Sequence, residues 1–86
     1  MNIMNDIEKK VREIIGEIIS SNELDIWKLE KDDNLFHYGL DSMSAVSLIV
    51  NLEDAFSFEF PEDDLTTDNI KTIERIVSYV SKKSSE

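Results

Sequence analysis

Apolar residues in the first quarter of the chain recur every three to four positions. They are Ile3, Ile7, Val11, Ile14, Ile15 and Ile18. This spacing gathers the apolar side chains on one face of an α-helix. We therefore predict an amphipathic helix over residues 3–19, closed by the polar run at 20–22. Its solvent face is expected to carry Glu8, Lys9, Arg12, Glu13 and Glu17.

The next segment, residues 21–41, has no sustained helical period. It contains the turn-forming residues Asp25, Asp32, Asp33, Asn34 and Gly39. It also contains large apolar residues, namely Leu24, Ile26, Trp27, Leu29, Leu35, Phe36 and Leu40. A solvated loop would not carry so many of these. We expect an ordered loop that lies across the helices and contributes to the core, and loops of this length are often functional.

Helical spacing returns after Asp41. A broad apolar face extends to about Phe56 and comprises Ala45, Val46, Leu48, Ile49, Leu52, Ala55 and Phe56. Asp41 is the expected N-cap, because its carboxylate can accept hydrogen bonds from the free backbone N–H groups of the first turn. Pro61 is expected to end this helix, since proline cannot continue one.

The last part of the chain predicts a turn and a short helix over residues 62–71, capped by Thr66 or Thr67. Thr72 is then expected to cap a final helix that carries Ile73, Ile76, Val77 and Val80. The sequence shows no internal repeat and no β-alternation. These patterns predict an all-α four-helix bundle with three main helices, one short helix and a long first loop. We expect a single domain over residues 1–86 with an ordered core of about 3–82.

Composition removes several classes of function. The chain has no cysteine, so disulfides, thiolate metal sites and a cysteine nucleophile are excluded. The N-terminus lacks the pattern of a secretion signal, and no apolar stretch approaches the ~20 residues that span a bilayer. We therefore predict a cytoplasmic protein that does not bind membranes. A monomer is expected.

Charge is distributed unevenly along the chain, whose net charge is −10. Residues 30–68 carry eleven acids and one base, whereas residues 69–86 carry two acids and four bases. The acidic middle would repel nucleic acid and attract a basic partner. The simpler interpretation, that the charge only keeps a small protein soluble, is equally compatible with this distribution.

One stretch can carry chemistry, namely Gly39-Leu40-Asp41-Ser42-Met43. A serine at a helix start projects its hydroxyl close to free backbone N–H groups and the positive end of the helix dipole. A phosphate ester on that oxygen would be well placed there. Gly39 would permit a tight approach of the loop to the helix. The alternative is that Asp41 and Ser42 form only a helix cap.

This motif resembles the Gly-x-Asp-Ser-Leu pattern of acyl and peptidyl carrier proteins, with Met43 in place of the leucine. The flanking segments 33–36, 52–56, 60–61 and 64–73 also resemble that family, so the similarity covers about residues 7–80. The resemblance implies an acyl-carrier-like four-helix bundle, free-standing, whose Ser42 receives 4′-phosphopantetheine from coenzyme A. It also implies a protein that is not an enzyme and that binds no metal of its own.

The resemblance further implies a set of partners. They are a phosphopantetheinyl transferase, an acyl- or aminoacyl-loading enzyme, and downstream synthase or tailoring enzymes of a polyketide, nonribosomal peptide or related pathway. The family docks partners on its second helix, which here suggests Asp41, Met43, Val46, Glu53 and Asp54. Val46 could instead belong to the core, and the two later acids could be an ordinary solvated face. Ser47 stands where fatty-acid-type carriers often have an acid, which argues against a role confined to fatty-acid synthesis.

Three other interpretations compete with this one. A calcium loop from Asp32 fails, because it would need glycine and glutamate where His37 and Met43 stand. A hydrolase built on Ser42, His37 and Asp41 lacks the G-x-S-x-G elbow, and His37 is better explained as a loop or half-buried structural residue. The remaining alternative is an unmodified acidic helical adaptor that binds a basic protein.

Overall fold

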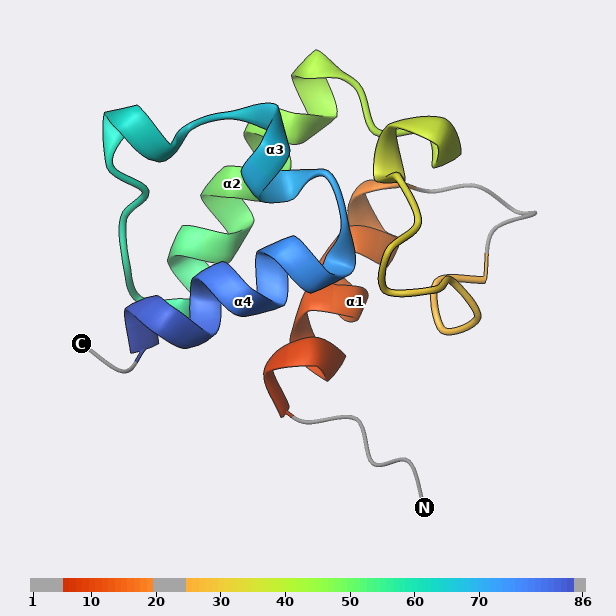
Figure 1. The fold of residues 1–86 in the computed structure, drawn as a ribbon, viewed down its shortest axis with the longest axis horizontal. Coiled ribbons are helices and arrows are strands. Elements are labelled where there is room, and N and C mark those ends of the chain that lie inside the picture. The colour runs from red at the N-terminus through yellow and green to blue at the C-terminus, as the bar shows by residue number, and fades with distance from the viewer. Residues whose placement is uncertain (1–5, 20–24, 85–86) are drawn as a thin grey trace.

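A computed structural model describes residues 6–19 and 25–84 of the chain. In the described part the fold is helical and contains no strand, as predicted (Figure 1). The elements are α1 (Asp6–Ile18), the 3₁₀ turn η1 (Leu35–Tyr38), α2 (Ser42–Phe56), the 3₁₀ turn η2 (Glu62–Asp64), α3 (Thr67–Ile70) and α4 (Ile73–Ser84). The expected first helix therefore begins at Asp6 among the described residues, and the predicted closing run 20–22 lies outside them.

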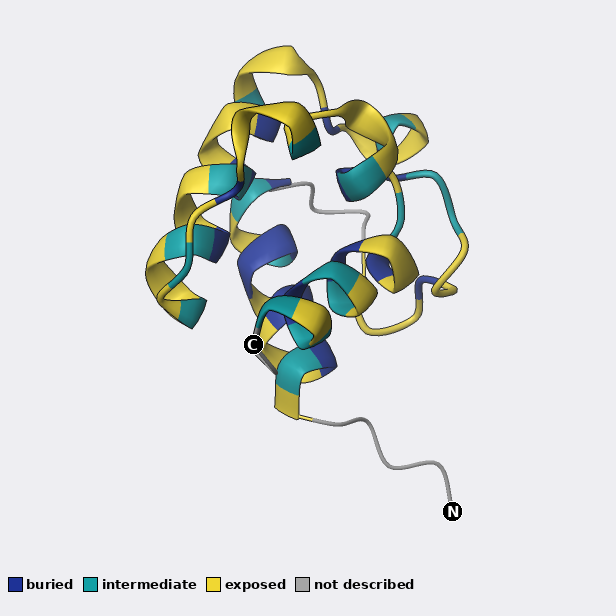
Figure 2. Cartoon of the chain, turned by 60° about the vertical axis from the view of Figure 1, so that its left-hand side comes forward, coloured by how far each residue is buried: buried dark blue, intermediate teal, exposed yellow. Residues whose placement is uncertain are grey.

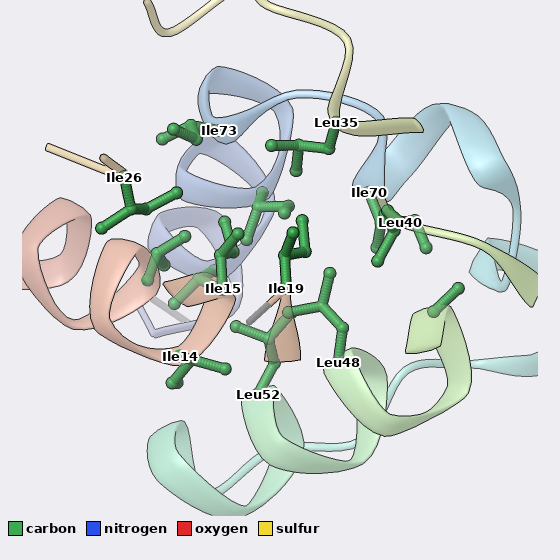
Figure 3. Close-up of a cluster of buried hydrophobic side chains, with 14 of the residues drawn as sticks. Ile14, Ile15, Ile19, Ile26, Leu35, Leu40, Leu48, Leu52, Ile70 and Ile73 are labelled. Carbon is green, nitrogen blue, oxygen red and sulfur yellow. The ribbon is translucent and has the colours of Figure 1, made fainter. Parts of the chain in front are cut away.

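The core lies between α1, α2 and α4. α1 packs against both α2 and α4, and the short α3 packs against α4. Each long helix sends a row of aliphatic side chains inward, as the close-up in Figure 3 shows for Ile15, Leu48 and Leu52. Polar and exposed positions follow on the outer faces (Figure 2). The periodicity of the sequence thus predicted most of the buried positions, but it was wrong for Val46 and Ala55, which are exposed on α2.

The loop before α2 is ordered over its described residues and closes one side of the core. Ile26, Leu29, Leu35 and Leu40 are buried, as expected for a loop that contributes to the core. The expectation was wrong for Trp27, whose side chain remains 46% exposed. The loop is held by backbone hydrogen bonds, since Leu35 N donates to Lys71 O (2.8 Å) and Glu74 N donates to Lys31 O (3.0 Å).

A buried ion pair ties α1 to this loop. Glu8 and Arg12 are 6% and 4% exposed, although the sequence pattern had assigned both to the polar face. Arg12 Nε donates to Glu8 Oε2 (3.1 Å), and Arg12 Nη1 donates to the carbonyls of Ile26 (2.6 Å) and Leu29 (2.9 Å). The guanidinium therefore supplies hydrogen bonds that the buried loop backbone needs. An acid four residues before a base is the sequence signal that could have revealed the pair.

The end of α2 differs from expectation. The helix ends at Phe56 as predicted, but the terminating residue is Ser57, which adopts the left-handed conformation with φ of 55°. Its backbone N–H closes onto Glu53 O, as in a left-handed helix C-cap. Pro61 lies further along and precedes η2 instead of breaking α2.

The segment after α2 is fixed to α4 by aromatic side chains. The rings of Phe60 and Tyr79 stack with centroids 4.7 Å apart, and the Tyr79 hydroxyl donates to Asp64 Oδ2 (2.7 Å). Thr72 caps α4 as predicted, because its Oγ1 accepts from Arg75 N (3.1 Å). Thr66 is the N-cap residue of α3 but makes no side-chain capping bond. Within the described ranges, no helix is both long enough and apolar enough to cross a bilayer.

Candidate functional site

The start of α2 is organised by Asp41 and Ser44, which form a capping box. Ser44 N donates to Asp41 Oδ1 (2.9 Å), and Asp41 N donates to Ser44 Oγ (2.8 Å). The Ser44 hydroxyl in turn lies 2.9 Å from Asp41 Oδ1, where it donates. Each side chain thus satisfies a backbone group of the other residue. Asp41 is the N-cap, as predicted, but its box partner Ser44 was not identified from the sequence.

Ser42 is the first residue of α2 and is exposed. Within the described part of the chain, its hydroxyl has no hydrogen-bond partner, in contrast to the fully engaged hydroxyl of Ser44. The interpretation of Ser42 as part of the cap is therefore unsupported, since the cap is made by its neighbours. A free, exposed hydroxyl at the positive end of a helix is available for modification, and an anion attached to it lies beside the helix dipole.

The loop that leads into Ser42 is shaped by Gly39. Gly39 has φ of 116° and caps η1, with its N–H closing onto Leu35 O. A Cβ added there would lie 3.0 Å from Ile19 Cγ2, so the glycine allows this turn to rest against the end of α1. Leu40 is buried on the other side of the turn. This geometry fixes the direction from which the chain enters α2.

Gly39→Ala is expected to destabilise the protein by about 1–2 kcal/mol, because an L-residue is strained at this φ. The close contact with Ile19 adds to that loss. Urea unfolding of both proteins measures the difference. Gly16→Ala is the control, since Gly16 lies inside α1 and is expected to cost less. Equal stability of Gly39→Ala and the unsubstituted protein would contradict the prediction.

The pKa of Asp41 lies below its ordinary value of 3.8, mainly because its carboxylate accepts from the Ser44 backbone N–H, and also because of the Ser44 hydroxyl. The Asp41 carboxylate therefore binds a proton more readily in the unfolded chain than in the folded chain. The stabilisation by this cap is therefore complete above pH 3.8 and is lost as the pH falls through the lower folded pKa. An NMR titration of the Asp41 carboxyl carbon is expected to give a midpoint below 3.8, and Asp41→Asn should remove this part of the acid dependence.

The outer face of α2 carries an apolar stripe next to Ser42. Met43, Val46 and Val50 are 85%, 61% and 56% exposed, at helical spacings of three and four. Residues 42–52 contain no charged side chain. The alternative that Val46 belongs to the core is therefore wrong. Val50, which the sequence had not singled out, continues the stripe, because its side chain follows on the same helical face.

The two acids assigned to partner recognition at the end of α2 differ in environment. Asp54 is exposed. Glu53 is half-buried, and its Oε2 accepts from Phe60 N (2.9 Å), so this carboxylate holds the segment after α2. Five of the residues singled out from the sequence thus lie exposed at the N-cap of α2 or along it, namely Asp41, Ser42, Met43, Val46 and Asp54. The Glu53 carboxylate instead forms a hydrogen bond within the fold.

His37 lies exposed in η1, with Nε2 3.5 Å from Asn34 Nδ2. It is therefore a loop residue, as expected, but it is not half-buried. Within the described ranges, no three His, Asp or Glu side chains are grouped so as to hold a metal ion. The site consists of an exposed serine, a capped helix end and an apolar stripe.

A free serine at a capped helix start, on a small helical bundle, is the arrangement expected of a carrier protein. The sequence matches the family described as "Phosphopantetheine attachment site" over residues 9–80. The chain therefore belongs to this family of phosphopantetheine-binding carrier proteins, and 4′-phosphopantetheine is its covalent cofactor.

Two solved structures are similar over most of the chain. One is the solution structure of the holo acyl carrier protein NE2163 from Nitrosomonas europaea, with a TM-score of 0.81 and 28% identity, covering 96% of this chain and 100% of that one. The other is a carrier protein from Agrobacterium tumefaciens, in a complex with engineered Bradyrhizobium japonicum glycine:[carrier protein] ligase and ATP. It has a TM-score of 0.78 and 25% identity, covering 88% of this chain and 97% of that one.

The residues present fit the cofactor. The Ser42 hydroxyl is exposed and free among the described residues, so attachment breaks no hydrogen bond of the fold. The Asp41–Ser44 box keeps the first turn of α2 formed without any contribution from Ser42. The identity of the attachment residue stays a prediction from the motif and this geometry.

Proposed function

We propose that this protein carries acyl or aminoacyl groups on a phosphopantetheine arm attached to Ser42 and presents them to partner enzymes of a biosynthetic pathway, of the polyketide, nonribosomal peptide or a related kind. The single observation that supports it best is the exposed, unbonded Ser42 hydroxyl at the start of α2. The arm supplies a terminal thiol that holds cargo as a thioester. The chain itself is non-catalytic.

The contribution of the chain itself is to position the arm. Asp41 and Ser44 hold the first turn of α2, Gly39 sets its approach, and the aliphatic core fixes α2 against α1. A rigid base keeps the arm anchored at one point. The sphere that the cargo can reach is then set by the length of the arm alone.

Partner docking is assigned to the stripe Met43, Val46 and Val50, with Asp41 and Asp54 at its two ends. The stripe is apolar and its helical segment is uncharged, so the contact itself is apolar and the end acids orient the partner. Glu53 is left out of this surface because its carboxylate is bonded to Phe60 N. A substitution of Glu53 would affect partner docking only indirectly, through the structure of the segment that Glu53 holds.

Both kinds of cargo have support. The Nitrosomonas europaea relative is an acyl carrier protein, and the Agrobacterium tumefaciens relative is a carrier protein in a complex with an engineered glycine:[carrier protein] ligase. An amino-acid-loading or acyl-loading enzyme and a phosphopantetheinyl transferase are therefore the proposed partners. A monomer in the cytoplasm also remains our proposal.

The experiment is intact-protein mass spectrometry after incubation with coenzyme A, magnesium and a broad-specificity phosphopantetheinyl transferase. We expect a gain of one phosphopantetheine group per chain. The product is then incubated with ATP, glycine and the Bradyrhizobium japonicum ligase, or with an acyl-loading enzyme. A second gain that hydroxylamine removes identifies the cargo class, because hydroxylamine cleaves thioesters.

No mass gain with several transferases, on protein that is shown to be folded, would overturn the proposal. An unmodified adaptor would then be the better account. Val46→Glu is the informative variant, since it places a charge in the middle of the apolar stripe. It is expected to raise the KM of a loading enzyme about tenfold or more while leaving the unfolding transition unchanged.

A further inference from the structure

α4 presents a basic face on a protein that is otherwise acidic. Arg75, Ser78 and Lys82 follow one another at helical spacings of three and four residues, and all three are exposed. Lys71, which precedes the helix, is also exposed. Within the described residues, no carboxylate lies within 4.0 Å of the cationic groups of Lys71, Arg75 or Lys82. These cations are therefore available to a partner.

A groove runs beside this face. It is lined by Asn69, Glu74, Arg75, Ser78, Tyr79 and Lys82, and its volume is about 500 Å³. Two cations and one acid thus border it, together with the hydroxyl of Ser78. Arg75 and Lys82 are seven residues apart, which separates them by about two helical turns, or roughly 10 Å.

One wall of the groove is rigid. The Tyr79 ring stacks on Phe60 (4.7 Å), its hydroxyl bonds to Asp64 (2.7 Å), and Lys83 Nζ lies 5.7 Å from the ring centroid. A fixed aromatic surface beside two exposed cations suits a segment with carboxylates and an apolar side chain. The groove can bind such a segment without the entropic cost of first ordering this wall.

The groove is separate from the attachment site. Figure 1 shows α2 beginning at the top of the molecule, whereas the C-terminal end of α4 lies at the lower left. α1 packs against both helices. A segment bound along α4 therefore leaves Ser42 and the apolar stripe of α2 open.

We propose that the α4 groove, with Arg75, Ser78, Lys82 and Tyr79, docks an acidic segment of a partner protein. Charge complementarity carries this assignment, because a groove bordered by unpaired cations attracts carboxylates even on a chain of net charge −10. A second copy of the chain is disfavoured by that same net charge. Such a tether would hold the carrier near an enzyme while α2 engages its site.

The test is an NMR titration of the ¹⁵N-labelled protein with acetylated and amidated hexaglutamate in low-salt buffer. We expect saturable shifts of the Arg75, Ser78 and Lys82 amides. The double variant Arg75→Glu/Lys82→Glu should bind about tenfold more weakly or not at all. The matched control is Lys9→Glu/Lys10→Glu, which changes the net charge equally at two exposed lysines of α1 that do not line the groove. It should change the affinity less than about twofold.

Three outcomes would overturn the proposal. Shifts spread over all lysines, or equal weakening by the control variant, would mean that only net charge matters. Equal shifts with inorganic phosphate would mean a simple anion site and not a docking groove for a protein segment. Loading of Ser42 in the intact-mass assay should be unchanged in Arg75→Glu/Lys82→Glu, so failure of this proposal is distinguishable from failure of the carrier function.

Discussion

Ser42→Ala is expected to abolish phosphopantetheine attachment completely while leaving the fold and its stability nearly unchanged. The hydroxyl that would be modified is removed, and no other hydroxyl at the helix start is equivalent. Ser44 has its oxygen within the capping box, bonded to Asp41. Because Ser42 makes no hydrogen bond among the described residues, its loss should change the free energy of unfolding by about 0.5 kcal/mol or less.

The measurement combines intact mass after incubation with the transferase and urea unfolding of the same samples. Ser44→Ala is the contrasting variant. It breaks the box with Asp41 and should lower the free energy of unfolding by about 1 kcal/mol, yet it keeps the attachment residue. Ser47→Ala, on an exposed position one turn further along α2, should change neither quantity. A mass gain on Ser42→Ala would mean that another residue carries the arm.

Arg12→Met is expected to destabilise the protein by about 3–5 kcal/mol, because it leaves a buried carboxylate and two buried carbonyls without their donor. Glu8 is 6% exposed, so its charge is poorly solvated, and the exposed Lys31, whose Nζ lies 3.4 Å from Glu8 Oε1, cannot replace a buried guanidinium. The carbonyls of Ile26 and Leu29 lose bonds of 2.6 and 2.9 Å. Domains of this size are stable by roughly 5–15 kcal/mol, so the loss approaches the whole margin.

Urea unfolding followed by circular dichroism measures this change. The control is Lys10→Met on the same helix, whose ion pair with Glu13 spans 3.9 Å between half-exposed side chains and should be worth about 0.5 kcal/mol or less. Glu8→Gln in the Arg12→Met background should recover part of the loss, because it removes a buried charge that no longer has the Arg12 guanidinium beside it. A loss below about 1 kcal/mol in Arg12→Met would show that water or loop movement replaces the guanidinium.

The sequence by itself determined the helices through their hydropathy pattern and the family through the motif at residues 39–43 and its flanking segments. The α-helical period can be recognised in the sequence without knowing what the helix packs against, because apolar residues three and four apart fall on one face of any helix. The start of α2 also depends only on residues that are close in sequence, because Asp41 and Ser44 form hydrogen bonds with each other across one turn. Gly39 was expected to permit a tight approach of the loop to the helix, and the structure shows it at φ of 116° with Ile19 close by.

Only the tertiary structure decided which residues of an amphipathic surface are free. Val46 and Leu48 are both apolar residues of α2, yet one is 61% exposed and the other fully buried, since burial depends on where α1 lies. In the sequence Glu8 and Arg12 look like ordinary polar-face residues, whereas in the structure the loop covers them and its carbonyls accept hydrogen bonds from Arg12. The free hydroxyl of Ser42, the bonded carboxylate of Glu53 and the lack of a carboxylate beside Arg75 and Lys82 among the described residues likewise depend on neighbours distant in sequence or on the exact direction of a side chain. Periodicity specifies faces, whereas contacts between segments far apart in the chain specify what each face meets.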